Sequence, residues 1–314
     1  MTLPPIITVT LNPAIDQTLA INGFAAGRVN RVQQSHTHPG GKGVNVAVML
    51  ADLGASVVAT GWLGNRNAEG FQLLFAQKRI DDQFLRVPGE TRVGIKITDE
   101  SSGQTTDINF PGLRLPPTAG DGLIDHLKTL IRPDQWVVLA GSVPPGIDDD
   151  FYGRLIDVVQ AQGGRVALDT SGEPLRHALP HGPDLVKPNV EELSALLGRP
   201  LATPGDLIEA AREAIIRHGT ALAVVSMGGD GALFVEAGRA VRTHPPHVAV
   251  KSTVGAGDAM VAGLVYALAN GLSLDEAARL STALSVYAVT RMVSGLETPN
   301  GHESYAAQIR LEPA

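Results

Sequence analysis

Short, uninterrupted apolar segments alternate along this chain with stretches in which apolar residues recur at helical spacing. The apolar segments are interpreted as strands and are residues 6–11, 57–61, 136–140, 166–169, 184–187 and 221–226. Helices are predicted at residues 44–53, 68–78, 150–161, 206–218, 258–269 and 274–291. Continuous apolar strands that alternate with helices are typical of a parallel sheet covered on both faces. We therefore predict an α/β fold with three layers, αβα, around a mostly parallel sheet.

One region departs from this alternation. From Thr91 to Ile97, and again over residues 106–110, polar and apolar residues alternate with a period of two, as in half-buried strands. Residues 17–38 have a similar extended, polar character. An ordinary edge hairpin would also fit. We favour a small β-sheet lid, formed by insertions at about 17–38 and 90–110, on a single domain that spans residues 1–314.

Composition limits the chemistry. The chain has no cysteine, which excludes disulfides, zinc–thiolate sites and cysteine nucleophiles. The net charge of −7 argues against a nucleic-acid-binding surface. The histidines show no metal-ligand spacing, and His36 and His38 are interpreted as surface residues. Because we find neither a signal-peptide pattern nor an apolar stretch of about 20 residues, we expect a cytoplasmic protein that binds no membrane.

The strongest motif is the segment Ser252–Gly263. Its small residues Gly255, Ala256 and Gly257 precede a helical pattern, where backbone amides and the helix dipole favour a phosphate. A carboxylate at Asp258 would repel a phosphate, but it could accept the proton of a hydroxyl that attacks the phosphate. Asp258 could equally cap the helix, and spacing alone does not separate these two interpretations.

Two turns near the N-terminus carry candidate ligand-binding residues: one is rich in glycine and the other contains an aspartate. Gly40 and Gly41 precede Lys42 and Asn45, which offer a cation and an amide, although the spacing is not that of a Walker A loop. Asp16 follows the first strand, at the sheet edge where ligands bind in open α/β folds. Its carboxylate could bind two sugar hydroxyls, or it could simply form a turn.

Two further turns lie in the C-terminal half. Asn189 and Glu192 have the spacing of a helix capping box, and they could instead lie near Mg²⁺ and its waters. Lys187 would then lie near nucleotide phosphates. The glycine-rich turn Ser226–Gly231 follows a strand and would pack closely against a nucleotide.

An anionic substrate requires cations. Arg92 and Lys96 share one face of the predicted lid hairpin, and Lys42 and Arg28 could converge on the same space. Arg92 and Lys96 are four positions apart, a separation of about 13 Å in a strand. One phosphate could therefore contact both residues only through their long side chains. Each could also be a solvated surface cation, and this is the better interpretation of Arg28.

Taken in order, these motifs resemble the ribokinase-like (PfkB) family of carbohydrate kinases nearly from end to end. The matching segments are residues 12–16, 40–45, 139–146, 169–175, 184–192, 226–231 and 252–263. The last is that family's C-terminal signature. The sequences TLNPAID (10–16), GGKGVNVA (40–47), TR-x-x-x-K (91–96) and DINFPG (107–112) resemble the branch that phosphorylates ketohexose phosphates.

The resemblance implies a ribokinase-like core and the transfer of a phosphate from ATP to the 6-hydroxyl of fructose 1-phosphate, giving fructose 1,6-bisphosphate and ADP. Asp258 would be the general base, and the amides of 255–257 would form an anion hole. The implied substrate-binding residues are Asp16, Arg28, Gly40, Gly41, Lys42, Asn45, Arg92, Lys96 and Ser142, together with Asp258. The implied nucleotide-binding residues are Lys187, Asn189, Ser226, Gly228, Gly231, Thr253, Gly255 and Gly257.

The resemblance also implies Mg²⁺ bound through water at Asn189 and Glu192. A monovalent cation such as K⁺ would lie near Ser252, Val254 and the loop at 288–294. A homodimer would form through the lid. Ala259 stands where relatives commonly have serine, a change that leaves the neighbouring aspartate intact.

Several alternatives stay open. Fructose 6-phosphate or tagatose 6-phosphate could be the acceptor. A kinase of an uncharged sugar or nucleoside would not need Lys42 and Arg92 in its pocket. A non-catalytic sugar- or nucleotide-sensing module would not need Asp258. A nucleotide-binding dehydrogenase is disfavoured, because no GxGxxG follows the first strand.

Overall fold

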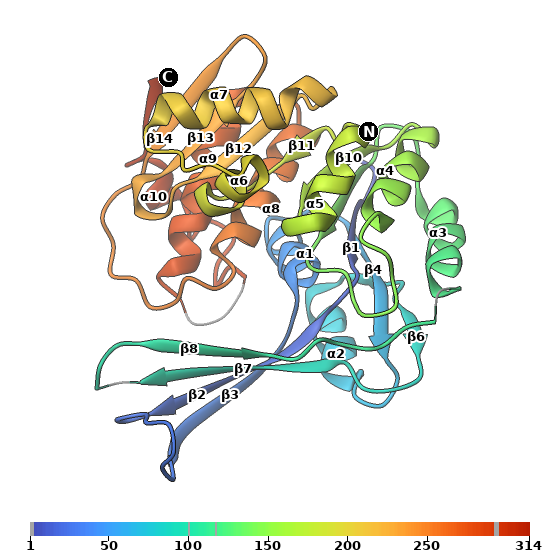
Figure 1. Ribbon diagram of the computed structural model, residues 1–314, viewed down its shortest axis with the longest axis vertical. Helices are drawn as coiled ribbons and strands as arrows, with labels where there is room; N and C mark the ends of the chain where they lie inside the picture. The colour runs from blue at the N-terminus through green and yellow to red at the C-terminus, as the bar shows by residue number, and fades with distance from the viewer. Residues whose placement is uncertain (1–2, 100, 117, 292–294) are drawn as a thin grey trace.

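The structure is a computed structural model that describes residues 3–99, 101–116, 118–291 and 295–314 (Figure 1). Within these residues the main sheet has eleven strands, in the order β15-β14-β13-β12-β11-β10-β9-β1-β4-β5, with β6 also paired to β4. The parallel strands are β1 (Ile6–Thr10), β4 (Val57–Gly64), β5 (Asp81–Asp82), β6 (Leu85–Val87), β9 (Trp136–Ala140), β10 (Arg165–Asp169), β11 (Leu185–Val186) and β12 (Leu222–Ser226). The antiparallel strands β13 (Ala232–Val235), β14 (Ala240–His244) and β15 (Arg310–Pro313) extend one edge.

Helices cover both faces of this sheet (Figure 1). One apolar core packs around α1 (Lys42–Asp52), α2 (Glu69–Lys78), α8 (Ala256–Ala269), α9 (Leu274–Val289) and α10 (Glu303–Ala306). The other packs around α3 (Ala119–Leu130), α4 (Phe151–Ala161), α5 (Gly172–Ala178), α6 (Val190–Leu197) and α7 (Pro204–Ala214). In β9, Val138 joins the first core and its neighbours Val137 and Leu139 join the second. Burial on both faces explains the continuous apolar segments and confirms the predicted three-layer αβα fold.

The predicted helix at 206–218 is too long. The α-helix α7 ends at Ala214, and residues Ile216–His218 form a separate 3-10 turn, closed by Gly219 in the left-handed region. Among the described residues no helix has both the length and the hydropathy needed to cross a membrane.

A second sheet of four strands projects from the core, in the order β3-β2-β7-β8 (Figure 1). Its strands are β2 (Ala14–Ile21), β3 (Val32–Gly40), β7 (Arg92–Asp99) and β8 (Thr105–Asn109). The pair β7–β8 is the predicted antiparallel hairpin, and β2 joins it in parallel register. The two predicted insertions therefore pair with each other, and this four-stranded sheet is called the lid below.

Candidate active site

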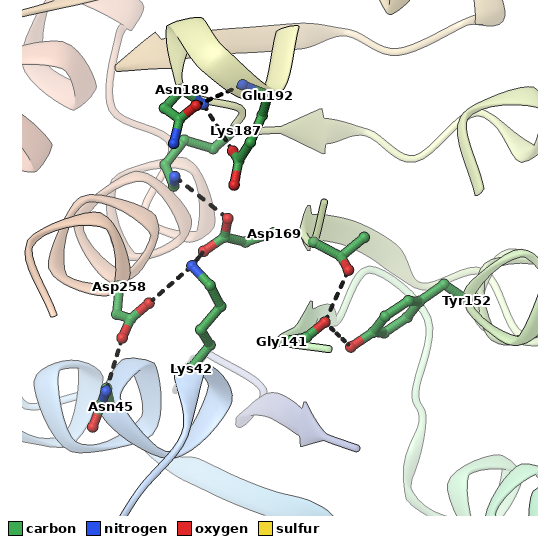
Figure 2. Close-up of polar contacts among 10 residues, drawn as sticks. Lys42, Asn45, Gly141, Tyr152, Asp169, Lys187, Asn189, Glu192 and Asp258 are labelled. Atoms are coloured by element: carbon green, nitrogen blue, oxygen red, sulfur yellow. Dashed lines mark hydrogen bonds and ion pairs between the residues drawn. The ribbon is translucent and has the colours of Figure 1, made fainter. Parts of the chain in front are cut away.

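Asp258 lies in the first turn of α8, where it faces the first turn of α1 (Figure 2). Its Oδ2 accepts a hydrogen bond of 2.8 Å from Asn45 Nδ2, and its Oδ1 lies 3.6 Å from Lys42 Nζ. The capping interpretation of Asp258 is wrong, because Gly255 is the N-cap residue and no side chain caps this helix. Burial raises the pKa of the Asp258 carboxyl, and the positive charge of Lys42 acts in the opposite direction.

A second buried aspartate joins this group. Asp169 ends β10 with its Oδ2 3.0 Å from Lys42 Nζ and its Oδ1 3.4 Å from Lys187 Nζ (Figure 2). Burial disfavours the charge of Asp169, but Lys187 and Lys42 outweigh it and lower the pKa of this carboxyl. The pKa values of Asp169 and Asp258 are thus displaced in opposite directions, as in sites where only one of two acids works as a base.

Sequence reasoning matched Asp169 only as part of a family segment and gave it no role. The available signal was its place at the carboxyl end of an apolar strand, which is the argument that selected Asp16.

The start of α8 is built for an anion. Gly255 has a φ of 77°, in the left-handed region, and it turns the chain into a helix of 14 residues whose first amides receive no side-chain cap. A Cβ on Gly257 would lie 3.4 Å from Lys187 Nζ, in contact with that ammonium, and the glycine leaves this space open. Unpaired amides, the helix dipole and a lysine together favour a phosphate here.

A large cleft of about 820 Å³ opens beside this helix start. Of the predicted nucleotide-binding residues, those that line it are Asn189, Ser226, Gly228, Gly231, Thr253 and Gly257. Asn189 and Glu192 do form a capping box, with Asn189 Oδ1 2.7 Å from the Glu192 amide and Glu192 Oε2 2.9 Å from the Asn189 amide. The second carboxylate oxygen of Glu192 takes no part in this cap.

A smaller cleft of about 300 Å³ lies between the lid and α1. Asp16, Asn45 and Lys96 line it, as do Ser252 and Val254 on the opposite side. Burial raises the pKa of the Asp16 carboxyl to about 6, although the cations Arg92 and Lys96 oppose this shift.

The glycines at the start of α1 allow close packing around this cleft. A Cβ on Gly40 would overlap Asp16 Oδ2, and Gly41, with a φ of 112°, would bring its Cβ to 2.9 Å from Pro13 Cα. The interpretation of the paired histidines as surface residues holds for His36, which is exposed, whereas His38 is only partly at the surface. The side chain of His38 is half-buried, and both histidines line the small cleft.

The structure does not bring the four predicted cations together. Lys42 is paired with Asp169 and Asp258, and Lys96 forms an ion pair of 2.6 Å with Asp107. Arg28 is exposed in the loop between β2 and β3.

Arg92 lies at the base of the lid, where its guanidinium donates to the carbonyls of Phe110 at 3.1 Å and Asn12 at 3.4 Å. Asn12 Nδ2 in turn donates to Ser142 Oγ at 3.1 Å, which places Ser142 at this same end. Ser142 follows Gly141, whose carbonyl accepts from Tyr152 and Thr170, each at 2.9 Å (Figure 2).

The predicted monovalent-cation site is only partly within the described residues. The Ser252 amide donates to the Val289 carbonyl at 3.2 Å, and the Val254 amide donates to Ser252 Oγ at 3.2 Å. Residues 292–294 of the predicted loop lie outside the described part of the chain.

Known proteins resemble this chain over nearly its whole length. The family model "pfkB family carbohydrate kinase" matches residues 9–300. The 1-phosphofructokinase of Rhodobacter capsulatus is 47% identical over 98% of this chain and 97% of its own, and that of Xanthomonas campestris is 44% identical over 96% of each. The 1-phosphofructokinase of Escherichia coli K12 is 37% identical over 98% of each chain.

A solved structure gives the same result. Phosphofructokinase-2 from Escherichia coli in complex with fructose-6-phosphate is 32% identical and superimposes with a TM-score of 0.89, covering 98% of this chain and 99% of its own. These similarities confirm the resemblance inferred from the motifs and the ribokinase-like fold. On this evidence the chain belongs to the pfkB family of carbohydrate kinases, phosphotransferases whose acceptor is an alcohol group.

Proposed function

We propose that this kinase transfers the γ-phosphate of ATP to the 6-hydroxyl of fructose 1-phosphate, giving fructose 1,6-bisphosphate and ADP. The curated relatives at 37–47% identity are 1-phosphofructokinases. The single observation that carries the chemistry is the position of Asp258. Its hydrogen-bond partner Asn45 lines the small cleft and its helix neighbour Gly257 lines the large one, so the buried carboxylate of Asp258 has a neighbour in each cleft.

In this mechanism Asp258 takes the proton of the 6-hydroxyl as that oxygen attacks the γ-phosphorus, and the bond from phosphorus to the β–γ bridging oxygen breaks to release ADP. The raised pKa of Asp258 makes it a stronger base than an ordinary aspartate, while the positive charge of Lys42 favours its ionised form. The amides of 255–257 and Lys187 would stabilise charge on the phosphoryl group. Closure of the lid would exclude water.

Mg²⁺ would neutralise charge on the β- and γ-phosphates of ATP. The described residues contain no cluster of three or more acidic or histidine ligands, which suits an ion held mainly by phosphate oxygens and water. Within our proposal Glu192, with Asn189, would hold such waters through the carboxylate oxygen that the capping box leaves free. K⁺ near Ser252 and Val254, and a cytoplasmic location, are also part of this proposal.

A homodimer through the lid completes the proposal. On one face of the lid, Leu19, Ile95 and Ile108 lie among polar residues such as Gln17 and Thr106, and Ile108 is 45% exposed. An exposed isoleucine on this face suits burial against a second copy. Sedimentation of the protein with and without a charged substitution at Ile108 would test the dimer.

Fructose 6-phosphate is a second candidate acceptor, because the similar solved structure of phosphofructokinase-2 binds it. Coupled assays with fructose 1-phosphate, fructose 6-phosphate and tagatose 6-phosphate would separate these acceptors. We expect the highest kcat/KM with fructose 1-phosphate. A clear preference for either of the other two would contradict the proposed substrate.

The same coupled assay tests whether Asp258 is the general base. We expect Asp258→Asn to retain binding of ATP and sugar phosphate and to lose roughly 10²–10⁴-fold in kcat, the usual effect of removing a positioned base. Ligand-induced shifts of the melting temperature would verify that binding persists. Turnover close to the wild-type rate would remove Asp258 from this role.

A further inference from the structure

The cleft-facing side of the lid is organised in rows that run across its four strands. The register places His38, Asp16, Gly94 and Asn109 side by side in one row. The next row consists of His36, Thr18, Lys96 and Asp107, and all eight residues line the small cleft. Gly94 is thus the one member of these two rows without a side chain, and it lies in the middle of the sheet.

The backbone does not require a glycine at position 94. Gly94 is not among the residues with a positive φ, and a glycine inside a strand weakens that strand relative to alanine. A Cβ at this position would lie 2.8 Å from Asp16 Oδ1 and 3.6 Å from Asn109 Oδ1. Because a Cβ at 2.8 Å would have to displace the Asp16 oxygen, the glycine keeps the cleft face clear beside this carboxylate.

The carboxylate beside this space lacks a partner. Asp16 lies between Gly94 and Gly40. A Cβ added at either position would press against one of the carboxylate oxygens of Asp16. In the described part of the chain no hydrogen bond or ion pair reaches the Asp16 carboxylate, although burial strongly affects it. Buried polar groups are normally paired, so an unpaired one that lines a cleft indicates a site for a polar ligand.

We propose that Gly94 is a specificity-determining position, and that the acceptor sugar phosphate lies directly over its backbone, bound by Asp16 on one side and Asn109 on the other. This inference rests on the proposed function and extends it to the shape of the acceptor site. The residue at position 94 sets how closely a sugar can approach the lid.

The test is a series at position 94, Gly94→Ala, Gly94→Ser and Gly94→Val, with Asn109→Ala. For Gly94→Ala we expect the KM for fructose 1-phosphate to rise roughly 10-fold or more, since one methylene in a binding pocket changes discrimination on that scale. The larger side chains should raise it further, and the KM for ATP should stay unchanged. Asn109→Ala should raise the KM for the sugar phosphate alone.

Stability distinguishes this role from a structural one. The Cβ of Gly94→Ala would push against Asp16 Oδ1, the far end of a side chain that can shift, and alanine suits a strand interior better than glycine. Gly94→Ala should therefore melt close to the wild-type temperature while it binds the acceptor more weakly. Gly122→Ala is the matched control, because a Cβ there meets nothing within 4 Å in α3, and its KM values should not change. An unchanged KM in Gly94→Ala, or a lowered melting temperature with parallel losses for both substrates, overturns the inference.

Binding without ATP separates this inference from the proposed function. Fructose 1-phosphate alone should raise the melting temperature of the wild type and fail to raise that of Gly94→Val. A wild type that phosphorylates none of the three sugar phosphates refutes the proposed function. An active wild type with an insensitive position 94 refutes only the specificity role.

Discussion

Replacing Asp16 by asparagine should make the folded protein more stable and the enzyme worse. The folded-state pKa of Asp16 is about 6, compared with 3.8 for an unperturbed aspartate, mainly because burial disfavours its charge. A difference of one pKa unit corresponds to about 1.4 kcal/mol, so ionised Asp16 destabilises the fold by about 3 kcal/mol. Asparagine has the same shape and carries no charge, so it removes this destabilisation.

The stability difference between Asp16→Asn and the wild type should increase with pH. A carboxyl whose pKa is raised on folding binds its proton more tightly in the folded state, so the destabilisation is absent below pH 3.8, grows between 3.8 and 6, and is complete above 6. We expect Asp16→Asn to gain about 3 kcal/mol at pH 8 and about half of that at pH 5. Because both proteins share all other titrating groups, the difference between them isolates this one.

Urea denaturation of both proteins at pH 5 and pH 8, without ligands, measures the effect. Activity assays should show that the KM for the sugar phosphate rises, since a carboxylate that accepts two hydrogen bonds is lost. An equal stability change at the two pH values, or a loss of stability at pH 8, would refute the reasoning that Asp16 is an unpaired, destabilising carboxylate retained for ligand binding.

Two further predictions concern the reacting centre. Lys42→Met removes the cation that lowers the pKa of Asp258, so the acidic limb of the kcat/KM profile should move to higher pH. An unmoved limb would mean that Lys42 does not control the base. Glu192→Gln keeps a capping-box acceptor for the Asn189 amide, so α6 should persist while the Mg²⁺ concentration for half-maximal activity rises about 10-fold. Mg²⁺ titrations of activity would measure this, and an unchanged midpoint would argue against a role for Glu192 near the metal.

The fold could be predicted well from the sequence because its strongest signals are local. Continuous apolar segments such as Trp136–Ala140 become central strands whose alternate side chains enter two cores. The helices α3 and α5 and the antiparallel strands β13, β14 and β15 were not predicted. The edge strand β15 pairs with β14, which is distant in sequence, and such pairing leaves little local pattern.

The site was predicted where a motif lies within one turn and missed where it depends on tertiary contacts. Asp258 was selected from its glycine-rich neighbours. The sequence identified Lys42 as a cation but could not show that its ammonium pairs with Asp169, which is 127 residues away. Nor could it show that His38 turns toward the cleft, because that depends on the register between β2 and β3.

Three features of this chain conflict with ordinary rules of stability, and all of them lie at the two clefts. Gly94 weakens the middle of a strand, Asp16 is a half-buried carboxylate with no partner among the described residues, and Asp258 is a buried carboxylate with a raised pKa. Local conflicts of this kind persist in natural proteins chiefly at functional sites. In each case a bound sugar phosphate would remove the conflict, because it would fill the space over the glycine, donate hydrogen bonds to one carboxylate and give a proton to the other. Substitutions that remove such a conflict, such as Asp16→Asn, should therefore stabilise the protein while they weaken binding of the acceptor.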